Sequence, residues 1–401
     1  MRVTDLERLF VQQVLDSQFR SSAGSLMTQR LEQKFAEIFQ VRYAIAHING
    51  TATLHSALVA AGVGSGDEVI VPPLTMSSTS FAVLHAGAIP VFADIDPLTF
   101  NLDPNKVESC ISSRSKAVIP VALYGLSPDL GPITHLAAKH NLTVIEDDAQ
   151  CVLGRYKGRL VGSIGHMASF SFQSSKHLAS GEGGMVITDS EKLAAAVRRF
   201  NSLGYAGVAA GPGKGKITRE TIQDPNYERH VSVGFNYRMP ELCAAVALAQ
   251  LERAEELVNQ RTQVAKLFSK AVEGCSWLRA QYVPEGYIHS YWTYVLLLEN
   301  LNDLTWYDFR NKFMDFGGDG VYAAWQLTYL EPAFRGMRFH ENQRQAYERG
   351  LCPVAESTQP RLFQFKTNYF DFVRAQSQAD ALSRTIEYFE KTRNYRTVAL
   401  S

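Results

Sequence analysis

Lys176 lies in a loop of small residues whose composition suits covalent chemistry with a carbonyl compound. The segment Ser169–Thr188 reads SFSFQSSKHLASGEGGMVIT, in which two apolar runs flank the lysine and a glycine-rich turn follows it. Schiff-base formation requires an uncharged lysine amine, which a partly desolvated pocket favours more than an exposed helix face does. The alternative is an ordinary surface charge, and the segment alone leaves both open. The adjacent His177 is predicted to be structural or peripheral, not a base.

A run of polar residues, Asp147-Asp148-Ala149-Gln150, follows a strand expected at Leu142–Glu146. Ligand sites in open parallel sheets lie beyond the carboxyl ends of the strands, so acids at this point are well placed for chemistry. One of these carboxylates could hold a protonated ring nitrogen. The alternative is that either aspartate caps a following helix.

A helix start is the third feature. Asn49 and Gly50 lead directly into the helical run TATLHSALVAA, which begins at Thr51. A glycine followed by a hydroxyl residue at a helix start leaves backbone N–H groups free, and these groups suit a phosphate. The alternative is a helix cap without a ligand. Three serines that precede the lysine, Ser171, Ser174 and Ser175, carry hydroxyl groups that can donate to a phosphate, although such serines are common in loops.

The fourth feature is the segment Gly234–Glu241, GFNYRMPE, which opens a long Ala-rich helix. Asn236, Tyr237 and Arg238 could bind an anion there or could cap the helix.

These features are carried by alternating strand-like and helix-like runs between Phe39 and Asp189. Apolar strands joined through helices predict a mostly parallel sheet covered on both faces, which is an α/β architecture. The expected strands are Glu68–Val71, Ile89–Ala93, Ala117–Leu123, Leu142–Glu146, Ala168–Phe172 and Met185–Thr188. The expected helices include Thr51–Ala61, Ser78–Gly87, Gly131–His140 and Glu191–Phe200.

The second half of the chain has a different texture. Tyr205–Val231 is a Gly- and charge-rich stretch too long for an ordinary connection, and such loops are usually functional or mobile. A helical run at Pro240–Lys270 follows it. We expect a large domain over residues 1–255 and a smaller α+β domain over residues 256–401, with a strand at Tyr291–Glu299 and a terminal helix at Gln376–Arg393.

The composition of the chain is that of a soluble globular protein. Lys plus Arg and Asp plus Glu each number 40, and this balance gives no support to a nucleic-acid or membrane partner. The five cysteines are scattered without a C-x-x-C pair, which predicts reduced thiols and no metal site. The first residues form an amphipathic pattern without a signal peptide, so we expect a cytoplasmic location.

The four features in this order resemble the DegT/DnrJ/EryC1/StrS family of sugar aminotransferases, which has the fold of pyridoxal-phosphate-dependent (fold type I) transferases. The resemblance covers most of the chain and is strongest from Arg30 to Gln260. It rests on GVGSGDEVIVPPLT, the strand-end EDDAQ, the lysine segment and GFNYRMPELCAAVALAQLERAEEL. The fold it implies has a large domain around a seven-stranded sheet.

The resemblance implies a role for each matched residue. Lys176 corresponds to the lysine that bonds pyridoxal 5'-phosphate and then shuttles the proton. Asp147 corresponds to the partner of the pyridinium nitrogen, and Gln150 to the contact of the phenolic oxygen. Gly50, Thr51 and Ser171 match phosphate-binding positions. Asn236 matches an asparagine supplied by the neighbouring subunit, which implies a homodimer with shared sites.

The chain departs from the family pattern at three places. Met76 follows Thr75 where an aromatic residue usually stacks on the cofactor ring, and a thioether can still cover that face. The segment Pro120–Gly125, PVALYG, lacks a common histidine. The segments Gly320–Pro332 and Leu362–Asp371 also differ, in regions expected to face the sugar or its nucleotide. The differences in these last two segments concern the substrate and not the cofactor.

The function implied is transfer of an amino group from glutamate or glutamine to a nucleotide-linked 3- or 4-keto-6-deoxy sugar, for glycan or natural-product biosynthesis. One alternative is an aminotransferase for a keto-cyclitol or a keto-sugar phosphate. Sugar dehydratases of the same family replace the motif lysine by histidine, and the order Ser175-Lys176-His177 argues against that activity. A cofactor-binding regulator without turnover is the remaining alternative. Some of the side chains that recognise the hydroxyl groups of the sugar are expected in the loop Tyr205–Val231 and around Trp325.

Overall fold

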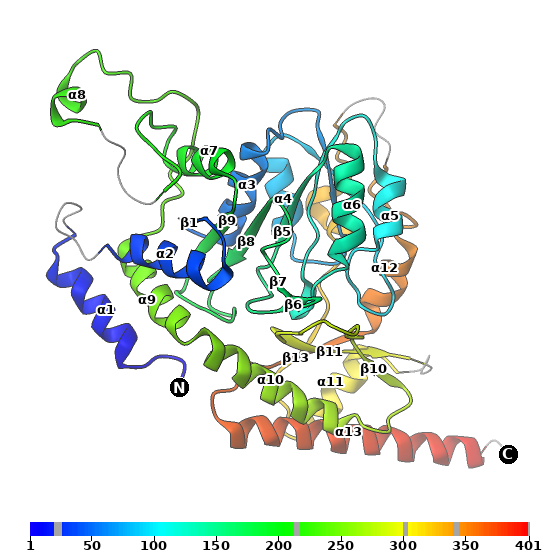
Figure 1. Ribbon diagram of the computed structural model, residues 1–401. Coiled ribbons are helices and arrows are strands. Elements are labelled where there is room, and N and C mark those ends of the chain that lie inside the picture. Colours follow the sequence, from blue (N-terminus) through cyan, green and yellow to red (C-terminus); the bar gives the residue numbers. More distant parts are fainter. Residues whose placement is uncertain (20–25, 212–216, 300–303, 340–344, 400–401) are drawn as a thin grey trace.

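The structure is a computed structural model that describes residues 1–19, 26–211, 217–299, 304–339 and 345–399 (Figure 1). A seven-stranded sheet in the order β1-β9-β8-β5-β4-β2-β3 forms its centre. Its strands are β1 (Tyr43–His47), β2 (Glu68–Val71), β3 (Ile89–Phe92), β4 (Ser115–Val118), β5 (Thr143–Asp147), β8 (Met167–Ser171) and β9 (Gly184–Thr188).

The large sheet is mostly parallel. The pairs β2–β3, β2–β4, β4–β5 and β5–β8 are parallel, whereas β9 runs antiparallel to both β8 and β1. All strands except β9 therefore point the same way, and their carboxyl ends meet at one edge of the sheet. The predicted α/β class with a mostly parallel sheet is confirmed.

Successive side chains of each strand point to opposite faces of the sheet, and helices cover the apolar side chains on both faces. Val69 and Val71 face a core shared with α3 (Gly50–Ala60), α4 (Ser78–His85) and α7 (Glu191–Asn201). Ile70 faces the opposite side, which is covered by α5 (Pro104–Cys110) and α6 (Leu130–His140) and, over β1, β8 and β9, by α2 (Met27–Phe39) and α9 (Glu241–Glu252). The N-terminal α1 (Asp5–Asp16) packs on α9.

Some elements differ from their expected bounds. β4 ends at Val118, five residues before the expected end at Leu123, and the chain then turns through a short 3-10 helix at Leu123–Gly125. Pro120 lies in this stretch and has no N–H to continue a strand. The single helical run expected at Pro240–Lys270 divides at Arg253 into α9 and α10 (Ala254–Ala271).

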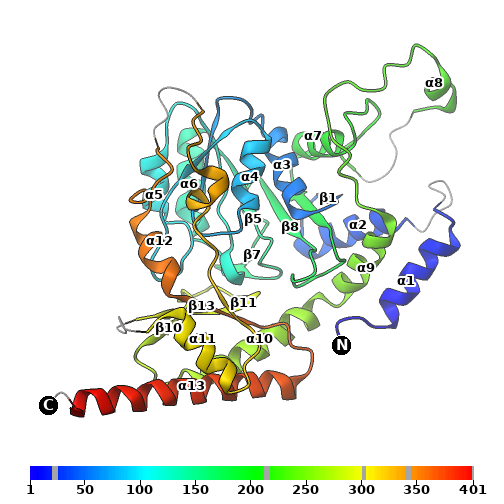
Figure 2. The same ribbon diagram turned by 180° about the vertical axis from the view of Figure 1, so that it is seen from behind.

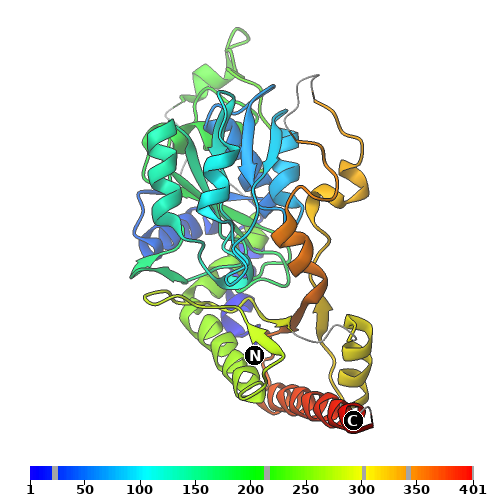
Figure 3. The same ribbon diagram turned by 90° about the vertical axis from the view of Figure 1, so that its right-hand side faces the viewer.

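A smaller antiparallel sheet lies at one end of the molecule, in the order β10-β11-β13-β12 (Figures 1 and 3). Its strands are β10 (Leu278–Ala280), β11 (Thr293–Leu298), β12 (Val321–Ala323) and β13 (Leu362–Lys366), packed with α10, α11 (Trp306–Asp315) and α13 (Phe372–Ala399). All four strands follow residue 256, although the division at that residue stays a prediction. The expected strand and terminal helix correspond to β11 and α13.

The long stretch Tyr205–Val231 contains one short helix, α8 (Arg219–Gln223), which stands away from the sheets (Figures 1 and 2). Residues 212–216 of this stretch lie outside the described part of the chain. The remaining elements are β6 (Arg155–Tyr156), β7 (Arg159–Leu160), α12 (Pro353–Thr358) and 3-10 helices at Thr328–Leu330, Pro332–Phe334 and Gln359–Arg361. In the ranges given above, no helix combines the length and apolarity that a membrane crossing requires.

A late segment of the chain covers the edge strand β3. The side-chain oxygen of Gln345 accepts a hydrogen bond from the backbone N–H of Phe92 at 2.7 Å, and its nitrogen donates to the carbonyl of Phe92 at 2.8 Å. The hydroxyl of Tyr347 donates to the carbonyl of Pro90 at 2.5 Å. These bonds occupy backbone groups that an edge strand otherwise leaves unpaired.

Candidate active site at the carboxyl ends of the strands

Lys176 lies in the connection between β8 and β9, at the edge where the carboxyl ends of the strands meet. Its carbonyl accepts hydrogen bonds from Arg2 at 2.9 Å and from Arg261 at 3.0 Å. The carbonyl of the preceding Ser175 accepts from the indole N–H of Trp292 at 3.0 Å. The loop that carries the lysine is therefore fixed by side chains from distant parts of the chain.

The amine of Lys176 is desolvated, and it lies 4.4 Å from the centre of the Trp292 ring. Burial lowers the pKa of Lys176 to about 8, an effect opposed by the negative charge of Asp147 and reinforced by the positive charge of Arg261. An exposed lysine has a pKa of about 10.4, so a far larger share of this amine is uncharged near neutral pH. The uncharged amine is the form that attacks a carbonyl carbon.

Asp147 ends β5 and is buried. One carboxylate oxygen accepts from the hydroxyl of Thr79 at 2.8 Å, and the other from the backbone N–H of Ala149 at 3.2 Å. Burial raises the pKa of Asp147, whereas these hydrogen bonds and the charge of Lys176 favour its ionised form. Asp147 and Lys176 thus lie near enough for each charge to act on the other.

The neighbouring acids have other surroundings. Glu146 accepts hydrogen bonds from the backbone N–H groups of Gly162, Ile164 and Gly165, at 2.8, 2.8 and 2.5 Å. Asp148 is buried, and its Oδ2 has no hydrogen-bond partner among the described residues. Burial and the charges of the two neighbouring acids raise the pKa of Asp148 well above its usual range. Asp147 is therefore the strand-end acid best suited to hold a cation.

The N-terminus of α3 lies against the end of β8. Asn49 caps the helix through a hydrogen bond of 2.8 Å from the N–H of Ala52. A Cβ atom added to Gly50 would lie 2.9 Å from the Cβ of Ser171, so glycine permits this close approach. The structure therefore brings Gly50 and Ser171 together, and Thr51 follows in the first turn, where helical N–H groups have no partner within the helix. This arrangement fits a phosphate group.

Gln150 is buried and lies three residues after Asp147 in the sequence. Its side-chain oxygen accepts a hydrogen bond from the backbone N–H of Tyr124 at 2.8 Å. Tyr124 has a φ of 63°, a left-handed conformation that is uncommon for a tyrosine. Such conformations persist when the surrounding structure enforces them, and they concentrate at functional sites.

The remaining two predicted site residues lie on the surface. Met76 is 48% exposed and lies three residues before Thr79, the residue that donates to Asp147. Asn236 is exposed on a segment beyond the end of β1, where the N–H of Ile48 bonds the carbonyl of Tyr237 at 2.8 Å. The structure thus groups Lys176 with Asp147, and it places Asn236 on the outside.

Three residues of this site were not anticipated from the sequence, namely Thr79, Arg261 and Trp292. Each reaches the site from an element far away in the chain, and Arg261 lies in a helix where an arginine is usually exposed. The sequence places these residues in predicted helices and strands, but it does not indicate which groups their side chains bond.

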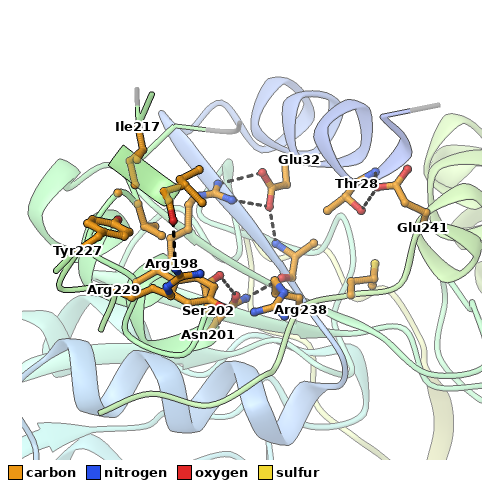
Figure 4. Close-up of a pocket in the computed structure, with 16 residues that line it drawn as sticks. Thr28, Glu32, Arg198, Asn201, Ser202, Ile217, Tyr227, Arg229, Arg238 and Glu241 are labelled. Atoms are coloured by element: carbon orange, nitrogen blue, oxygen red, sulfur yellow. Dashed lines mark hydrogen bonds and ion pairs between the residues drawn. The ribbon is translucent and has the colours of Figure 1, made fainter. Parts of the chain in front are cut away.

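A cavity of about 590 Å³ lies elsewhere, between α2, α7 and the stretch that contains α8 (Figure 4). Its walls include the buried ion pair of Glu32 and Arg198, whose atoms are 2.9 and 3.0 Å apart, together with Arg229 and Arg238. None of the residues predicted to hold the cofactor lines it, whereas Arg238 and part of the stretch Tyr205–Val231, which is expected to contact the sugar, do.

Known proteins are similar to this chain over most of its length. The model of the DegT/DnrJ/EryC1/StrS aminotransferase family matches residues 3–368. The chain is 43% identical over 264 residues to the GDP-perosamine synthase of Caulobacter vibrioides, an alignment that covers 66% of either protein. It is 35% identical to the GDP-perosamine synthase of Escherichia coli O157:H7, over 78% of this chain and 80% of that protein.

The fold is similar to that of an aminotransferase from Psychrobacter cryohalolentis. The TM-score is 0.82 at 31% sequence identity, and the superposition covers 94% of this chain and 96% of the other. The chain belongs to the DegT/DnrJ/EryC1/StrS aminotransferase family, and it is an aminotransferase that uses pyridoxal 5'-phosphate.

Proposed function

We propose that the chain transfers an amino group from glutamate or glutamine to the ketone of a nucleotide-linked 3- or 4-keto-6-deoxy sugar. The observation that carries the proposal is the desolvated amine of Lys176. Burial lowers the pKa of this amine to about 8, and the negative charge of Asp147 acts on it in the opposite direction. The names of the two perosamine synthases support a nucleotide-linked sugar as the acceptor. The product would enter a glycan or a natural product.

The residues around Lys176 fit the cofactor, which when bound supplies an electron sink for the substrate carbon. Lys176 would bond it, and the same nitrogen would accept and return a proton, for which a pKa near the working pH is suitable. Asp147 would hold the ring nitrogen and Gln150 the phenolic oxygen. Gly50, Thr51 and Ser171 would bind the phosphate, and the thioether of Met76 would cover one face of the ring.

The amino donor and the acceptor can be tested separately. Mixing the purified protein with glutamate, and in a second sample with glutamine, should change the visible absorbance of the cofactor and release the corresponding keto acid. If no amino donor changes the absorbance or releases a keto acid, the remaining alternative is a protein that binds the cofactor for regulation without turnover. Adding keto-sugar nucleotides should then restore the spectrum, whereas restoration by a keto-cyclitol or a keto-sugar phosphate alone would assign the alternative acceptor.

We further propose that the active sites are completed in a homodimer, with Asn236 reaching the phosphate site of the partner subunit. Exposed apolar side chains precede Asn236 in the same segment: Val231 is 55%, Val233 85% and Phe235 43% exposed. Ile48 is 37% exposed, and its backbone bonds this same segment. An apolar surface of this kind is typical of an interaction site.

Val233→Glu should weaken the dimer, because it places a charge in the centre of the proposed apolar interface. We expect the molecular mass from light scattering to move toward that of one chain, with a parallel loss of activity. Tyr307→Glu is the matched control, since Tyr307 is a 71% exposed side chain on α11 in the smaller sheet region. A Val233→Glu protein that keeps the mass of a dimer would contradict the proposed interface.

The location proposed for this reaction is the cytoplasm. The scattered positions of the five cysteines support this proposal, because a disulfide framework is typical of secreted proteins.

A further inference from the structure

We infer that Arg261 is a positioning residue for Lys176, which fixes the lysine loop and places a positive charge on the backbone of that loop. This inference rests on the proposed role of Lys176. Arg261 lies in α10, 85 residues after the lysine, and no feature of the sequence distinguishes it from the other polar residues of that helix.

The guanidinium of Arg261 joins the lysine loop to two parts of the smaller sheet region. Its Nη2 donates to the carbonyls of Ser175 at 2.9 Å and of Lys176 at 3.0 Å. Its Nη1 donates to the carbonyl of Trp292 at 2.8 Å and to the hydroxyl of Thr367 at 3.2 Å. The planar guanidinium can make these bonds at once because its donors are held in a rigid fork.

Arg261 is also a buried charge that forms no ion pair with a carboxylate in the described part of the chain. The residue is 4% exposed, and each of the four hydrogen bonds above ends on a neutral oxygen. Burial lowers the pKa of Arg261 to about 9, which still leaves it positively charged near neutral pH. A buried cation that is not neutralised repels a second cation nearby, so its field disfavours the charged form of Lys176.

The other ionisable groups around Lys176 do not replace this effect. Asp147 has the opposite sign and favours the charged amine. His177 and His289 are buried, and burial lowers the pKa of both, so they are neutral near pH 7. Arg2 bonds the same carbonyl as Arg261 at 2.9 Å, but it is only half-buried, so solvent screens its charge more than that of the buried Arg261.

The test compares Arg261→Gln, which keeps a hydrogen-bond donor and removes the charge, with Arg261→Lys, which keeps a charge and removes the fork. In each holoenzyme, the visible absorbance of the cofactor is titrated with pH in the absence of any amino donor. We expect the transition of Arg261→Gln to move upward by about one pH unit, because removing a like charge stabilises the protonated lysine nitrogen. Arg261→Lys should stay near the wild-type transition.

Arg2→Gln is the matched control, since it removes a donor to the same carbonyl, and its transition should stay at the wild-type position. A wild-type transition in Arg261→Gln would overturn the inference, as would an equal shift in Arg2→Gln. If Arg261→Gln does not fold, Arg261→Lys decides alone, because a shift of a full unit with the charge retained contradicts the assignment.

The attachment of the cofactor is checked in the same samples, by borohydride reduction and mass spectrometry of the labelled peptide. A label on Lys176 with an unmoved transition refutes only the role of Arg261. A label on another lysine refutes the proposed role of Lys176 itself.

Discussion

Replacing Lys176 by alanine should abolish amino transfer, with a loss of activity of about 10⁴-fold or more. The substitution removes the atom that bonds the cofactor and the group that moves the proton, and proton transfer alone contributes about 10²–10⁴-fold. The loop should keep its conformation, because Arg2, Arg261 and Trp292 bind its backbone carbonyls and not the lysine side chain. Release of keto acid from glutamate, followed with excess pyridoxal 5'-phosphate, measures the effect.

The control for this variant is Lys157→Ala. Lys157 lies in the turn between β6 and β7, and its side chain is 60% exposed. We expect wild-type activity in Lys157→Ala, and an unchanged molecular mass and thermal transition in both variants. Full activity in Lys176→Ala would refute the assignment of this lysine.

Replacing Asp147 by asparagine should lower activity by about 10²- to 10⁴-fold and weaken cofactor binding. Asparagine has nearly the same shape and can still accept from the hydroxyl of Thr79, but it carries no charge for the ring nitrogen. Breaking one partner of a buried ion pair costs about 3–5 kcal/mol, and each 1.36 kcal/mol on a barrier is tenfold in rate. The rate of amino transfer and the dissociation constant of the cofactor measure the two effects.

Asp148→Asn is the control for this variant, because the two acids are adjacent and equally buried. Burial and the two neighbouring acids raise the pKa of Asp148 well above its usual range, which favours the uncharged form that asparagine imitates, so activity should stay within a few-fold of wild type. The reverse result, a large loss in Asp148→Asn with wild-type rates in Asp147→Asn, would transfer the role to Asp148.

The candidate site was predictable where it is local in the sequence. Asp147 ends a strand, Gly50 starts a helix and Lys176 lies in the connection that follows a strand, and the carboxyl ends of parallel strands meet at one edge. Periodicity predicts these elements, and the family resemblance implies which of their residues form the site. The functional roles of these residues stay predictions until the variants are measured.

The rest of the site depends on packing between distant segments. Thr79 reaches Asp147 across 68 residues, and Trp292 bonds the carbonyl of Ser175 across 117. A hydroxyl or an indole in a helix or strand gives no sign of such a partner. The sequence does not predict the break at Arg253 for a related reason. The residues on either side of it have high helix propensity, whereas Arg253 itself leaves the helical conformation and bonds the carbonyls of Met1 and Arg2 at the other end of the chain.

The hydrogen bonds that Gln345 and Tyr347 make to the edge strand β3 can form only after most of the chain has been translated. Gln345 occupies both backbone groups of Phe92, yet it is translated 253 residues later. At 5–20 residues per second, that interval lasts roughly 10 to 50 s on the ribosome. Throughout this interval the nascent sheet presents an open strand that another nascent chain could extend. Chaperone binding near β3 during translation would protect the chain until the last quarter of the polypeptide closes that edge.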